Sequence, residues 1–180
     1  MLAEDETDLM MFPPLRSGWS PRGEPVEVEL SGWNARRVVF GAVNLRTGSR
    51  VVMPRSRNRS GDYQAFLSEV RSHYRGRHVA LLLDEAPSHT AKASLRAAEG
   101  VTLLWLPNRA PELNPMDTLW GQAKDVVSAN DQYETIEEHV RRFLEYIESL
   151  SGQETLHTAG VLSDGFWLKA VLSKNFCQPA

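Results

Sequence analysis

The chain has 180 residues, a size that suits one folded domain with a substantial hydrophobic core. Hydrophobic residues make up 42% of it, and its apolar runs are only as long as a strand, which argues against a membrane-spanning segment. The N-terminal residues lack the basic and apolar regions of a signal peptide, and the single cysteine, Cys177, cannot form an internal disulfide. We therefore expect a cytoplasmic protein.

The net charge of −3 conceals an uneven distribution of charged residues. Seven arginines and no acidic residue lie between residues 30 and 61, whereas residues 125–154 contain eight acids and two arginines. A basic region of this kind favours contact with the backbone of a nucleic acid. The arginines at positions 55, 57 and 59 could equally serve to solubilise a surface loop, and charge alone does not separate the two interpretations.

Strands are expected in the first third of the chain. Residues 2–7 predict a short strand, and after a loop rich in Pro, Gly and Arg the alternation at 26–30 predicts a half-exposed one. The β-rich runs 37–45 and 50–53 flank a turn in which Gly48 can adopt the left-handed conformation. These two runs therefore predict a hairpin.

Helices and buried strands are expected to alternate from there on. Apolar residues at helical spacing predict a helix from about Tyr63 to Tyr74, and Gly76 marks its end. The continuous apolar run 79–83 predicts a strand buried on both faces. Residues 101–106 predict another buried strand, with a short helix at 90–99 between the two.

The last third of the chain is expected to be helical. Asn114 is predicted to cap a helix that has Pro115 at its first position. The clearest amphipathic pattern spans residues 136–150, and a last short helix is expected within 162–176.

A meander of strands followed by βα units predicts an α/β fold in which a mixed five-stranded sheet carries helices on both faces. This is the element order of a ribonuclease-H-like fold. We expect residues 1–180 to form a single domain.

Carboxylates stand at two positions where such a fold places ligands. Asp84 closes the strand 79–83, and open α/β sheets bind ligands at the carboxyl ends of their strands. Asp117 lies in the first turn of the helix capped by Asn114. Hard cations such as Mg²⁺ prefer carboxylate oxygens, and two of them can activate a nucleophile and stabilise a leaving oxygen in phosphodiester chemistry. A third carboxylate near the N-terminus would complete a charge-balanced site for two such ions and one phosphate.

Each of these residues also has an ordinary structural interpretation. Asp84 could cap a turn, and Asp117 could merely stabilise a helix N-terminus. Chemistry alone does not choose among the three acids of residues 4–6. His89 could line the site or contact a phosphate, although a lone histidine near a helix start usually makes only local hydrogen bonds.

Tryptophans offer a second type of contact with nucleic acid, because every base can stack on an aromatic ring. Trp105 and Trp120 lie on apolar stripes and are expected in the core. Trp19 and Trp33 lie in Gly-rich loops and are the better candidates for contact with DNA.

Three segments together resemble the catalytic domain of DDE-type transposases, from the mariner-like group that includes related bacterial insertion-sequence transposases. The first is Glu4-Asp5-Glu6-Thr7, followed by the loop Gly18–Gly23. The second is Leu83–His89, and the third is Leu106–Trp120, which is long and specific. The resemblance covers about residues 2–167.

The resemblance implies a ribonuclease-H-like fold and Mg²⁺- or Mn²⁺-dependent DNA cleavage and strand transfer. Carried over by position, the ligands of two metal ions are Asp5, Asp84 and Asp117. The implied partners are transposon ends and target DNA, together with a second copy of the chain, and the implied location is the nucleoid of a bacterial cytoplasm. The residues expected to contact DNA are Arg36, Arg37, Arg55, Arg57, Arg59, Trp19 and His89.

Two departures from the family pattern bear on function. The third ligand is Asp117, where many relatives have Glu. No helix-turn-helix precedes the first catalytic strand, so we expect a truncated product, a second reading frame or a bare catalytic domain that works with a separate helix-turn-helix subunit. A catalytically silent remnant that only binds DNA or protein and a stand-alone structure-selective nuclease remain as alternatives.

Overall fold

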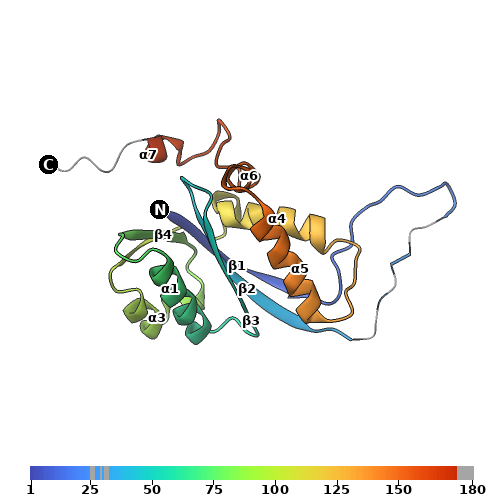
Figure 1. Ribbon diagram of the computed structural model, residues 1–180, viewed down its shortest axis with the longest axis horizontal. Coiled ribbons are helices and arrows are strands. Elements are labelled where there is room, and N and C mark those ends of the chain that lie inside the picture. Colours follow the sequence, from blue (N-terminus) through green and yellow to red (C-terminus); the bar gives the residue numbers. More distant parts are fainter. Residues whose placement is uncertain (25–26, 29, 31–32, 174–180) are drawn as a thin grey trace.

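The computed structural model describes residues 1–24, 27–28, 30 and 33–173. Its centre is a five-stranded sheet in the order β3-β2-β1-β4-β5 (Figure 1). An antiparallel meander is formed by β1 (Leu2–Met10), β2 (Arg36–Asn44) and β3 (Arg50–Arg55). The strands β4 (Val79–Leu83) and β5 (Val101–Trp105) continue the sheet parallel to β1. The predicted α/β class and mixed five-stranded sheet are confirmed.

Each face of the sheet has its own hydrophobic core, because successive side chains of a strand point to opposite faces. Leu2 of β1 and Phe40 of β2 pack with the buried side of α1 (Ser60–His73) and with Ala98, which follows α3 (Lys92–Ala97). The sequence predicted α1 from this same apolar spacing.

The opposite face is covered by α4 (Pro115–Val127), α5 (Ile136–Ser149) and α6 (Gly152–Thr158). Odd-numbered residues of β1, among them Ala3 and Leu9, belong to this second core, as do Trp120 and Phe143. Helices therefore cover both faces (Figure 1). None of the helices in the described part of the chain is long and apolar enough to cross a membrane.

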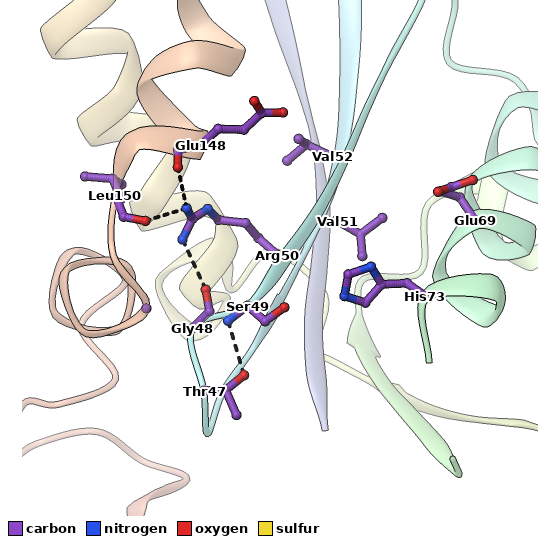
Figure 2. A pocket seen from close by; sticks show the side chains of 11 residues that line it. Thr47, Gly48, Ser49, Arg50, Val51, Val52, Glu69, His73, Glu148 and Leu150 are labelled. Atoms are coloured by element: carbon purple, nitrogen blue, oxygen red, sulfur yellow. Dashed lines mark hydrogen bonds between the residues drawn. The ribbon is translucent and has the colours of Figure 1, made fainter. Parts of the chain in front are cut away.

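The turn between β2 and β3 is fastened to the far end of the chain. Arg50 donates hydrogen bonds to the backbone oxygens of Gly48, Glu148 and Leu150 (Figure 2). It also donates to Oγ1 of Thr155. Gly48 has φ +68°, and a Cβ at that position would lie 2.0 Å from the carbonyl oxygen of Gly152. The predicted hairpin is confirmed, and α6 packs directly against its turn.

Several predicted boundaries differ from the structure. The first strand extends to Met10 because β2 pairs with it over its whole length. The helix expected at 90–99 is observed as the shorter α3. It is preceded by a short helix that was not predicted, α2 (Pro87–Thr90), and Ala91 between the two has an extended ψ of 138°. The strand expected at 26–30 is absent at Glu27, Val28 and Leu30, and its other two positions lie outside the described residues.

Two further differences concern the second half of the chain. The strand β5 was expected to be buried, but it forms an edge of the sheet, and Trp105 is 38% exposed. The helix α6 was not predicted, although Ser151 and Glu154 form a capping box at its start. Within the expected last helix, α7 (Lys169–Ser173) is observed, and residues beyond 173 lie outside the described part.

Candidate active site

The side chains of Asp5, Asp84 and Asp117 line one cavity of about 110 Å³. They come from the middle of β1, the residue after β4 and the first turn of α4. The other lining residues are Leu106, Pro107, Arg109, Ala110, Pro111 and Asn114. Three acids that are far apart in the sequence are thus brought together near the carboxyl end of β4.

Strand pairing explains how the first two acids meet. The parallel strands β1 and β4 pair Leu2 with Leu81 and Ala3 with Leu82. The same register, extended two residues past the last described pair, brings Asp84 to the level of Asp5 without fixing the distance between them.

Asn114 explains how the third acid joins them. Its Oδ1 accepts a hydrogen bond from the backbone N–H of Met116 at 3.0 Å, which caps α4 as predicted. Its Nδ2 donates to the backbone oxygen of Glu4 at 2.8 Å. Because Glu4 precedes Asp5 in β1, this buried amide ties the first turn of α4, and with it Asp117, to the strand that carries Asp5.

The three carboxylates repel one another inside this small cavity. Burial raises the pKa of Asp5 from 3.8 to about 8, and the charges of Glu6, Asp117 and Asp84 contribute to this rise. The pKa of Asp84 is instead lowered, chiefly by its hydrogen bond with His89. A cation in the cavity would relieve the repulsion, and hard carboxylate oxygens are the donors that Mg²⁺ and Mn²⁺ select.

Two positively charged residues at the site were missed by the sequence reasoning. Arg109 lines the cavity. Burial lowers the pKa of Lys124, whereas the nearby charges of Asp8, Asp117 and Asp5 raise it. Lys124 lies two turns after Asp117 on the same side of α4, a spacing that could have indicated its place near the site.

His89 lies on the other side of Asp84 and is only 1% exposed. Its Nδ1 is 3.0 Å from the backbone oxygen of Asp84 and 3.0 Å from Oδ1 of the same residue. Its Nε2 is 3.0 Å from Oε1 of Glu6 and 3.7 Å from Oε2 of Glu4. Burial alone would lower the pKa of His89, but its hydrogen bonds with Asp84 and Glu6 and the charges of Glu4 and Glu6 raise it to about 11.

The burial of His89 corrects one expectation. A side chain enclosed by Asp84, Glu6 and the ring of Tyr63, whose centroid is 4.4 Å away, presents no surface to DNA. His89 is therefore not retained among the residues expected to contact DNA. The alternation of β1 could have indicated this cluster, because Glu4 and Glu6 must point to the face opposite Asp5.

Glu4 is the most unusual member of the cluster. It is 0% exposed, and neither of its carboxylate oxygens has a hydrogen-bond partner in the described part of the chain. Burial, reinforced by the charge of Glu6, raises its pKa well above 4.5. Together with Glu6 and His89 it offers three ligand-type atoms within 4.8 Å of one another.

The predicted DNA-contacting arginines are not brought to the cavity. By strand alternation Arg36 and Arg55 point to the α1 face, opposite Asp5. Arg36 pairs with Asp8 at 2.7 Å, and Arg37 pairs with Glu137.

The remaining candidates for contact with DNA are exposed. Arg57 and Arg59 follow β3 and are exposed, and Trp19 is fully exposed in the loop that follows β1. Trp33 is also exposed, and Trp120 lies in the core as expected. Trp105 was expected in the core but is partly exposed.

Comparison with known proteins agrees with this geometry. The mixed sheet in the order β3-β2-β1-β4-β5, with helices on both faces, is the ribonuclease-H-like fold of transposase catalytic domains. The DDE superfamily endonuclease family matches residues 1–139, a span that contains all three aspartates. The chain belongs to the DDE superfamily endonuclease family.

Individual relatives are more distant. The chain is 22% identical over 152 residues to the insertion element IS630 uncharacterized 39 kDa protein of Shigella sonnei, which covers 82% of this chain and 44% of that protein. It resembles the Mos1 strand transfer complex with a TM-score of 0.68 at 16% identity, covering 98% of this chain and 55% of that one.

A Mos1 transposase catalytic domain solved with raltegravir and Mg gives a TM-score of 0.63 at 18% identity and covers 98% of this chain and 85% of that one. The chain thus spans about half the length of the insertion-element protein and of the chain in the Mos1 strand transfer complex.

Proposed function

We propose that this chain is the catalytic domain of an insertion-sequence transposase, which cleaves DNA and transfers a strand in a metal-dependent reaction. The observation that carries this proposal is the convergence of Asp5, Asp84 and Asp117 on one small cavity. Membership of the DDE endonuclease family supports it. So does the likeness of the fold to Mos1 transposase, which has been solved in complexes with transposon ends.

The three aspartates would hold two Mg²⁺ or Mn²⁺ ions. Bound there, the ions would supply activation of a water or 3′-hydroxyl nucleophile and stabilisation of the leaving oxygen. Both His89 and the backbone N–H of Ala86, 3.0 Å away, contact Oδ1 of Asp84, which leaves Oδ2 as the oxygen available to a cation. The donor set and the size of the cavity fit this role.

The protein's own cations would bind the scissile phosphate. Arg109 at the rim and Lys124 on α4 place positive charge beside the carboxylates, where it can offset the charge that develops on phosphoryl oxygens. Exposed Arg57, Arg59 and Trp19 are the remaining candidates for contact with DNA further from the reaction. Such backbone contacts supply affinity without reading sequence.

We assign recognition of the element's ends to a helix-turn-helix segment or subunit outside the sheet domain. A second copy of the chain is the expected partner on paired ends. The two alternatives are a catalytically silent remnant that only binds DNA or protein, and a structure-selective nuclease on the same fold.

Nicking of supercoiled plasmid in the presence of Mn²⁺ tests the proposal. The wild type should nick, and Asp84→Asn and Asp117→Asn should not, while circular dichroism shows that both variants are folded. The matched control is Asp164→Asn, which removes an exposed carboxylate that pairs with Lys169. Joining of a pre-cut element end to target DNA then separates a transposase from a nuclease, and a wild type that neither nicks nor joins would be a silent remnant.

A further inference from the structure

We propose that His89 is a positioning residue that joins β1 to the end of β4 and so sets the separation of Asp5 and Asp84. This inference rests on the proposed function, since the separation matters only if both acids hold metal. His89 does not touch the cavity itself. It acts on the site through the backbone and Oδ1 of Asp84.

The backbone alone does not fix this separation. The β1–β4 ladder pairs Leu2 with Leu81 and Ala3 with Leu82, and the described pairing goes no further. The strand β4 ends at Leu83, one residue before Asp84. The two acids therefore lie just beyond the last paired residues, where strands are free to separate.

The imidazole of His89 bridges the strands at this point. One ring nitrogen contacts Asp84 and the other contacts Glu6 of β1, each at 3.0 Å. Glu6 is the neighbour of Asp5, and the alternation of β1 sends their side chains to opposite faces. The ring thus connects the residue after β4 to the residue after Asp5, on the face of the sheet away from the metal cavity.

The ring itself is held in place on several sides. Tyr63 of α1 packs on it, and the short helix α2, which carries His89, is tied to α3 by a hydrogen bond of 2.6 Å from Oγ of Ser94 to the backbone oxygen of Ser88. A buried ring with both nitrogens engaged has one orientation available to it. It therefore holds the carboxylate of Asp84 in one position.

A metal ion among Glu4, Glu6 and His89 is the competing assignment. The Nε2 atom that would have to bind the ion lies at a hydrogen-bond distance from Oε1 of Glu6, and Nδ1 is engaged with Asp84. We therefore assign a positioning role to His89 and its two glutamates. Binding of a metal ion by this cluster would contradict that role.

Two conservative replacements separate the two halves of the bridge. The amide nitrogen of Asn can take the place of Nδ1 and keep the contact with Asp84, whereas that of Gln can take the place of Nε2 and keep the contact with Glu6. Neither side chain can contact Asp84 and Glu6 at the same time. Both His89→Asn and His89→Gln should therefore lose the connection between β1 and the end of β4. The matched control is His139→Gln, because His139 is also buried and hydrogen-bonded, to Ser128 at 2.6 Å, but contacts none of the three aspartates.

Hydrogen exchange of the metal-free protein gives the first readout. Both His89 variants should exchange faster than wild type at amides 83–86 and 4–7, whereas His139→Gln should leave these amides unchanged. Unchanged protection there in the His89 variants would overturn the proposal. This measurement does not depend on metal or activity.

Calorimetric titration with Mn²⁺ gives the second readout. Both His89 variants should bind Mn²⁺ about 10–100-fold more weakly, the usual effect of losing a group that orients a metal ligand. A weakening no larger than that of His139→Gln would overturn the positioning role. So would an ion that still binds when Asp5, Asp84 and Asp117 are all replaced by Asn and that is lost on the further change Glu4→Gln. A wild type that binds no Mn²⁺ would refute the proposed function, while hydrogen exchange still decides whether the bridge exists.

Discussion

Gly41 lies directly opposite Asp5 in the β1–β2 ladder, and its missing side chain is what allows Trp120 to pack against β2 at this position. A Cβ on Gly41 would lie 2.4 Å from Cζ2 of Trp120 and 2.6 Å from Cε of Met116. Both residues belong to α4, which also carries Asp117. The distance between α4 and the sheet, and hence between two of the three acids, depends on this glycine.

Gly41→Ala should therefore reduce both stability and cleavage. Overpacking of a core of this kind costs about 1–3 kcal/mol, and the displacement of α4 should reduce Mn²⁺-dependent nicking more than the loss of folded protein explains. Thermal unfolding and single-turnover nicking measure the two effects. Gly121→Ala is the control, because nothing lies within 4 Å of its Cβ position on the same helix and alanine there favours the helix. Equal nicking by the two variants would show that Gly41 does not set the position of Asp117.

Metal should stabilise the folded chain. Mg²⁺ or Mn²⁺ binds the assembled cavity and not the dispersed acids of the unfolded chain, so ion at 100 times Kd should add about 2.7 kcal/mol to the free energy of unfolding. In a domain of this size each kcal/mol raises the melting temperature by about 2–4 °C. Differential scanning fluorimetry with and without metal measures the shift. The same shift in Asp84→Asn would mean that the ions act elsewhere.

The pKa of Asp5 predicts how stability without metal depends on pH. The folded pKa is about 8 and the unfolded value is 3.8, so between these pH values the folded state holds a proton that the unfolded state has lost. The contribution of Asp5 to the free energy of unfolding is therefore greatest below pH 4 and is lost as the pH rises through 8. Asp5→Asn should exceed wild type in melting temperature at pH 8 but not at pH 4. Parallel curves for the two proteins between these pH values would contradict the raised pKa.

DNA binding by this chain should be weak and almost independent of sequence. Contacts between arginines and phosphates give non-specific affinities of about 10⁻⁴–10⁻⁶ M at physiological salt, and these fall as salt rises because bound phosphates release counterions. Replacing Arg57 and Arg59 by Ala should reduce the slope of that dependence. The control with the same change in charge is Arg141→Ala with Arg142→Ala, on the exposed side of the acidic helix α5. A hundredfold preference for the element's end over a random duplex would show that this chain reads sequence itself.

Local patterns were sufficient to predict the elements and two of the acids. The end of a buried apolar strand located Asp84, and an Asn-Pro helix start located Asp117, because each signal lies within a few residues of the acid it positions. The choice among residues 4–6 was different. Alternation separates Asp5 from its two neighbours, but which face lies under α4 depends on Asn114, which is 110 residues away.

The residues that were misjudged depend on sheet order and on distant partners. Trp105 lies on an apolar run, but its exposure follows from the position of β5 at the edge of the sheet, which the run does not encode. His89, on α2, is buried where it contacts Glu6 of β1, which is 83 residues away in the sequence. Arg50 likewise lies in the basic region of the sequence, but its guanidinium donates hydrogen bonds to the end of α5 and to α6.

That use of Arg50 limits where the chain can be shortened. The family match ends at residue 139, inside α5, whereas the carbonyl groups that receive the Arg50 guanidinium belong to Glu148 and Leu150. A fragment ending at residue 139 would remove the acceptors of Arg50 on Glu148, Leu150 and Thr155 and would leave the turn at Gly48 without the helix against which it packs. A fragment that keeps these contacts must therefore extend at least through the end of α6 at Thr158.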